Sequence, residues 1–151
     1  MRLSVASAAP LLLLALPSAR AFSSSNEMLD AASLADLQSR AEHAEAREQC
    51  FLYTQLVHNY VEVAGKQLAA GDIDEAKASL NRVQTFADLV HKVLAKDTKR
   101  VKNAEMLMHL TTFHLTQLMH LISSEDEAFV QATLKKLDKL HDELLAQVFA
   151  H

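Results

Sequence analysis

The sequence predicts an all-α protein, specifically an antiparallel up-down four-helix bundle with an extended or kinked first helix after a cleaved signal peptide. Three observations support this fold class. Both prolines of the 151 residues, Pro10 and Pro17, lie near the start, so the rest of the chain has none to break a helix. The only glycines are Gly65 and Gly71. Apolar residues also recur at the three- and four-residue spacing of a helix face over four long segments.

Residues 1–21 have the pattern of a secretory signal peptide. Arg2 is basic, residues 11–16 are almost all leucine, and residues 19–21 follow the small-x-small rule, which predicts cleavage after Ala21. The apolar run is much shorter than the ~20 residues of a membrane-spanning helix. We therefore expect a secreted or periplasmic protein with no stable membrane insertion after signal cleavage.

The remaining chain is predicted to hold a loosely docked N-terminal helical segment at residues 22–48 and a helical bundle domain at residues 49–151. Removing residues 1–21 takes away two arginines and no acid, so the net charge changes from −4 to −6. An acidic chain without Cys/His finger spacing is not expected to bind nucleic acid.

The first helix is expected to begin near Ser24, which has capping-box spacing to Glu27. Its apolar stripe is weak at first and becomes strong, in a rotated direction, from Cys50 onwards. The helix is therefore predicted to kink, or to start anew, within residues 45–49. As a lone cysteine on an apolar face, Cys50 is expected to be a small buried hydrophobe.

The next helices follow from turn signals. Gly71 suits the left-handed end of a helix, and Asp72 suits the cap of the following one. Asp97 or Thr98 is the expected cap of a third helix over residues 99–122, whose wide apolar arc predicts that it is the most buried helix.

The last helix is expected to start at a capping box formed by Ser124 and Glu127. Because the loops are short, consecutive helices are predicted to be antiparallel neighbours.

Three histidines are weak candidates for metal ligands. When the chain is folded at its turns, His58, His109 and His141 fall at nearly one level. His58 and His109 project from polar faces, whereas His141 stands within a leucine stripe. If all three turned inward, they could bind copper, zinc or iron, so a metal-binding bundle is the alternative function.

The pairs Asp88-x-x-His91 and Asp138-x-x-His141 resemble the Glu-x-x-His pairs of di-iron carboxylate bundles. That resemblance implies a metal pair held between helices. Asp is shorter than Glu, however, and Asp88 lies on the polar face of its helix. We therefore predict no metal ligand and no cofactor.

The sequence contains no glycine-rich phosphate loop and no nucleophile elbow, and it has little loop to carry an active site. It predicts a non-catalytic interaction or structural module rather than an enzyme. The expected partner is a protein or peptide, and a homodimer is one form of this. Phe51 either covers residues 22–48 or contacts a partner, and the basic run at residues 96–102 is either solvated or meets an acidic surface.

Overall fold

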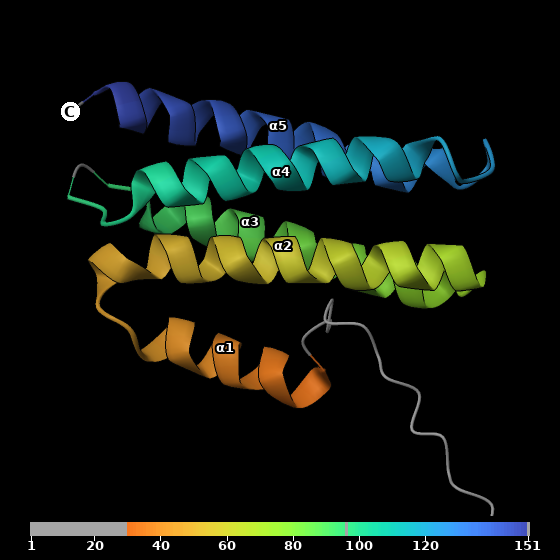
Figure 1. Ribbon diagram of the computed structural model, residues 1–151, viewed down its shortest axis with the longest axis horizontal. Coiled ribbons are helices and arrows are strands. Elements are labelled where there is room, and N and C mark those ends of the chain that lie inside the picture. The colour runs from red at the N-terminus through yellow and green to blue at the C-terminus, as the bar shows by residue number, and fades with distance from the viewer. Residues whose placement is uncertain (1–29, 96, 151) are drawn as a thin grey trace, which may run out of the picture.

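The computed structural model describes residues 30–95 and 97–150. They form the five helices α1 (Ala31–His43), α2 (Ala46–Ala70), α3 (Ile73–Val93), α4 (Val101–Met119) and α5 (Glu127–Phe149) (Figure 1). The described residues contain no strand, so the predicted all-α class is confirmed. The predicted signal peptide and the capping box of Ser24 and Glu27 lie outside the described residues. No described helix is long and apolar enough to cross a membrane.

The first two helices are separate elements. The backbone is extended at Ala44, so α1 ends and α2 begins anew at Ala46, within the range predicted for a kink or a restart. α1 packs on α2 and on no other described helix, and Figure 1 shows it running along one side of α2. The buried contacts of α1 come from Leu34, Leu37 and Ala41.

The turn between α2 and α3 follows the prediction. Gly71 adopts the left-handed conformation with φ of 81°, and its N–H donates to the carbonyl of Leu68 at 3.1 Å. Asp72 stands at the N-cap position of α3 as predicted, but its side chain makes no capping hydrogen bond. The turn makes α2 and α3 antiparallel neighbours.

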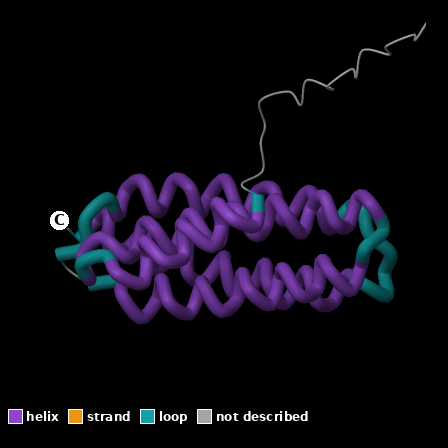
Figure 2. The backbone as a smooth tube through the Cα atoms, turned by 90° about the horizontal axis from the view of Figure 1, so that it is seen from below, coloured by secondary structure: helices purple, strands orange, loops and turns teal. Residues whose placement is uncertain are grey.

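The four long helices pack in the order α2, α3, α5, α4 and back to α2. Figure 2 shows the long helices running along a common direction. Side-chain contacts show their directions. His58 and Glu62 of α2 meet Thr111 and His114 of α4 in the same order along both helices, so α2 and α4 are parallel. α3 and α5 are also parallel, because the hydrogen bonds of Gln84 with Thr133 and of His91 with Glu143 follow the same order along both helices.

α3 and α4 are consecutive in the chain but are not neighbours. α3 and α4 run in opposite directions, as predicted, but the prediction that short loops make consecutive helices neighbours is wrong at this connection. The loop crosses instead to the start of α2, where the N–H of Lys99 donates to the carbonyl of Arg47 at 2.8 Å. The guanidinium of Arg100 stacks over the ring of Phe51 at 3.8 Å and so covers a ring predicted to cover residues 22–48 or to meet a partner.

Two predicted helix caps are wrong. α4 is preceded by Arg100 with φ of 58°, not by Asp97 or Thr98. Thr98 instead accepts a hydrogen bond from the N–H of Ala95 at the end of α3. Asp126 rather than Ser124 precedes α5. At α4 the preceding loop is held against the start of α2 by the hydrogen bond from Lys99 to Arg47, a contact that the local spacing does not show.

Of the two predictions about burial, the one for Cys50 is confirmed and the one for α4 is wrong. Cys50 is buried, as expected of a lone cysteine on an apolar face. α4 is not the most buried helix, because it has five buried residues whereas α2 and α3 have seven each. α4 stands at one corner of the four-helix arrangement and neighbours only α2 and α5. Its apolar arc is wider than the surface that these two helices cover.

Candidate functional site

An exposed row of apolar side chains runs along α4. Met106, Leu110 and Phe113 are 58%, 42% and 55% exposed, and Leu121 just beyond the helix is 77% exposed. Spacings of four and three residues put Met106, Leu110 and Phe113 on one side of the helix, and Leu121 follows in the turn after it. Large exposed apolar patches on soluble domains mark contact surfaces. We call these four residues the α4 stripe.

The chain segment that carries the α4 stripe is nearly free of charge. Over residues 103–124 the only charged residue other than histidine is Glu105, which is partly buried and bonded to His141. The exposed polar residues of this segment include His109 and Gln117. Protein interfaces have few charged residues at their centre, and this segment shares that composition.

One histidine pair borders α4 on the side of α5. The rings of His109 and His141 lie 5.3 Å apart between centroids. Nε2 of His141 lies 2.8 Å from Oε1 of Glu105, one turn before His109 on α4. A carboxylate only accepts hydrogen bonds, so Nε2 of His141 carries the proton that it donates to Glu105.

A second histidine pair borders α4 on the side of α2. The rings of His58 and His114 lie 6.1 Å apart. Nδ1 of His114 lies 2.6 Å from Oε1 of Glu62 and donates to it. Nδ1 of His58 lies 3.0 Å from the hydroxyl oxygen of Thr111. α4 is therefore fastened to both neighbouring helices through histidines.

The hydrogen bonds around His58 show which of its ring nitrogens carries a proton. The hydroxyl of Thr111 donates its proton to the carbonyl of Leu107 at 2.7 Å, so toward His58 it can only accept, and Nδ1 of the ring is the donor. Desolvation lowers the pKa of His58 below 6.5; the charge of Glu62 opposes this shift and His114 adds to it. The neutral ring of His58 does not take a proton from Thr111. The hydroxyl of Thr111 is therefore not activated as a nucleophile by this contact.

A groove lies between α2 and α4 beside the last residue of the α4 stripe. It has a volume of about 340 Å³ and is lined by Val61, Gly65, Leu118 and Leu121, among others. The close approach of the two helices depends on Gly65, because a Cβ there would lie 3.2 Å from Cδ1 of Leu118. The groove therefore continues from the α4 stripe onto α2, and its lining includes the polar side chains of Glu62, Lys66, His114 and Gln117 beside the apolar ones.

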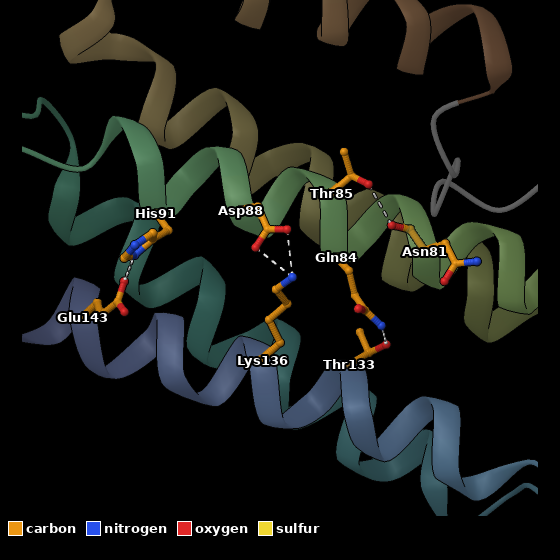
Figure 3. A network of polar contacts seen from close by, with 8 residues as sticks. All are labelled: Asn81, Gln84, Thr85, Asp88, His91, Thr133, Lys136 and Glu143. Atoms are coloured by element: carbon orange, nitrogen blue, oxygen red, sulfur yellow. Dashed lines mark hydrogen bonds and ion pairs between the residues drawn. The ribbon is translucent and has the colours of Figure 1, made fainter.

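α3 and α5 are joined by a separate row of polar contacts, which Figure 3 shows. Gln84 donates to Thr133 at 2.9 Å, and Asp88 pairs with Lys136 at 2.7 Å. One turn further along, His91 bonds Glu143 of α5. In the Asp88-x-x-His91 motif, each residue thus bonds a different residue of α5.

The structure brings together only part of the predicted histidine set. His109 and His141 face each other on the α5 side of α4, whereas His58 lies on the α2 side with His114. Within residues 30–95 and 97–150, no group of three or more His, Cys, Asp or Glu side chains could hold a metal ion. His91 and His141 also bond different helices, so the two Asp-x-x-His motifs form no common site.

No protein-family model, curated protein or solved structure matches the chain. The feature that sequence reasoning missed is the α4 stripe. A signal for it was present, because Met106, Leu110 and Phe113 form an apolar row distinct from the buried residues of the same helix. The sequence could not show which of the two rows faces the core, because that depends on where α2 and α5 pack.

Proposed function

We propose that the chain is a secreted or periplasmic, non-catalytic interaction module. In this proposal α2–α5 form a four-helix bundle, and α4 presents the surface that contacts a protein partner. The observation that carries the proposal is the exposure of the α4 stripe on a helix segment whose only charged residue, histidine aside, is Glu105. Export is supported by the signal-peptide pattern of residues 1–21.

The contacts around α4 support a rigid contact surface. Glu62 and Glu105 bond histidines across the interfaces of α2 with α4 and of α4 with α5. Interhelical contacts on both sides restrict rotation of the helix about its axis. A surface that is fixed before binding loses less conformational entropy on association.

The interaction is tested by photo-cross-linking in the cells that produce the protein, with the cross-linking group at Gln117 beside the α4 stripe. The substitution Met106→Asp/Leu110→Asp places two charges on the surface and is expected to abolish the cross-linked product. The matched control, Ala128→Asp/Ala132→Asp, adds the same charge at the same spacing on an exposed face of α5 and should leave the product intact.

Cross-linked products that are the same in both variants, or no product with the unsubstituted chain, would refute the interaction function. Export is checked separately by sequencing the N-terminus of the protein recovered outside the cytoplasm. A first residue of Phe22 is expected, and an intact N-terminus would contradict cleavage after Ala21.

A further inference from the structure

We infer that the occupant of the α4 stripe is a second copy of this chain, with the two α4 helices packed antiparallel across a two-fold axis. This inference rests on the proposed function, since it names the partner of the same surface. The axis passes between the positions of Phe113 and His114. The interface is then isologous, as in most homodimers, because both copies use the same residues.

The spacing of the α4 stripe fits this symmetry. An axis at this position brings Met106 opposite Leu121 of the second copy and Leu110 opposite Gln117 of the second copy. The two Phe113 rings meet beside the axis. Met106 and Gln117 lie ~16 Å apart along α4, about three turns, and Leu121 extends the contact from the turn after the helix.

The charges at the two ends select the antiparallel direction. Lys102 precedes the stripe and Glu125 follows it, and both are exposed. The same axis brings the start of α4, which carries Lys102, toward the turn after α4 of the second copy, which carries Glu125, and the symmetry repeats this contact at the other end. A parallel arrangement would bring Lys102 against Lys102 and Glu125 against Glu125, and such like-charge contacts disfavour a complex.

The groove between α2 and α4 provides a place for the side chain at each end of the contact. Leu121 lines this groove of about 340 Å³ together with Val61 and Leu118. Opposite Leu121 stands Met106 of the second copy, whose unbranched side chain adapts to irregular apolar spaces. The two ends of the interface would thus be closed by the same contact, related by symmetry.

The oligomeric state of the full chain is measured by sedimentation velocity. The unsubstituted chain and the control Ala128→Asp/Ala132→Asp are expected to be dimers that dissociate on dilution. The variant Met106→Asp/Leu110→Asp is expected to be a folded monomer, because its substituted residues are exposed. Circular dichroism checks that its helix content is unchanged. A dimer that both double variants retain would overturn the inference.

Cysteine cross-linking tests the direction of packing. Cys50 is buried, so an introduced surface cysteine is the reactive thiol of a folded chain. With a short bismaleimide, Phe113→Cys should give a covalent dimer. Met106→Cys alone and Leu121→Cys alone should not, whereas the double variant Met106→Cys/Leu121→Cys should. A covalent dimer of Met106→Cys alone would overturn the antiparallel arrangement.

A charge reversal gives an independent test. Lys102→Glu is expected to weaken the dimer at least several-fold, because each end then holds two acids. The double variant Lys102→Glu/Glu125→Lys should restore the unsubstituted dissociation constant, since it exchanges the two charges. If Lys102→Glu leaves the dissociation constant unchanged, or if the exchange fails to restore it, the proposed end contacts are wrong.

The failure of this inference can be distinguished from failure of the proposed function. If the chain is monomeric but its α4 stripe still cross-links to a different protein in cells, the partner is not a second copy of the chain. The proposed interaction function then still holds. A monomer in which the thiol of Phe113→Cys is protected would show that another part of the same chain covers the stripe, which overturns the inference too. A monomer with no cross-linked partner and an accessible thiol refutes both.

Discussion

His141 of α5 bonds Glu105 of α4 at 2.8 Å, and the side chains of these two residues are only 18% and 16% exposed. The histidine lies between Leu140 and Leu144, which are buried. An ionisable ring within a leucine stripe is accommodated here because a carboxylate from the neighbouring helix accepts a hydrogen bond from the ring N–H. The pair is close to both the core and the α4 stripe.

Removing only one partner of this pair should destabilise the protein. Glu105→Leu leaves His141 without its acceptor, and an unsatisfied buried polar group costs about 1–3 kcal/mol. The double variant Glu105→Leu/His141→Leu should recover most of this loss, since apolar residues of similar size can replace a buried pair at little cost. Urea unfolding followed by circular dichroism measures both. A double variant whose loss equals the sum of the losses of Glu105→Leu and His141→Leu would show that the contact is not coupled.

The stability of the protein should depend on the titration of His58. Its pKa is lowered below 6.5 by desolvation, so the unfolded chain binds the proton more readily than the folded one. The stabilisation is complete above pH 6.5 and is lost as the pH falls through the lowered folded-state value. His58→Gln should therefore lose less unfolding free energy on acidification than the unsubstituted chain. A folded-state pKa of 6.5 or above, measured by NMR, would contradict this.

Cys50 should react with thiol reagents only when the protein unfolds. Burial raises the pKa of the thiol from 9.0 to about 12, which suppresses the reactive thiolate. This contribution to stability is present below pH 9.0 and is lost as the pH rises toward the folded-state value. The rate of labelling by Ellman's reagent should increase with urea in parallel with unfolding. Fast labelling of the folded chain at pH 8 would refute the prediction.

Gly71 should tolerate asparagine better than alanine. Its φ of 81° lies in the left-handed region, where a Cβ costs about 1–2 kcal/mol and only asparagine and aspartate are readily accepted. We expect Gly71→Ala to lower the free energy of unfolding by about that amount and Gly71→Asn by less. No atom lies within 4 Å of a Cβ built at this position, so steric contact does not contribute. Equal stabilities of the two variants would exclude the conformational explanation.

Metal titration separates the interaction function from the metal-binding alternative. The described residues contain no group of three ligands, so we expect no rise in Tm when zinc or copper is added to the untagged chain. A real site at a hundredfold excess of metal over its Kd would add about 2.7 kcal/mol. A rise in Tm that His109→Gln/His141→Gln abolishes would favour metal binding.

The presence of the long helices and the position of one turn follow from local patterns in the sequence. The absence of proline after residue 17, the apolar periodicity and Gly71 predict long helices and one of the turns, because helix formation and termination depend on neighbouring residues. The burial of Cys50 followed from the same periodicity. Each of these properties depends on residues that lie close together in the chain.

The tertiary structure decided which helices are neighbours and which faces they cover. The hydrogen bond from Lys99 to Arg47 holds the loop after α3 at the start of α2, and α4 consequently packs on α2 and α5 instead of α3. That placement gives His141 its partner Glu105 and leaves Phe113 exposed. Such contacts join residues far apart in the chain, so no local pattern in the sequence specifies them.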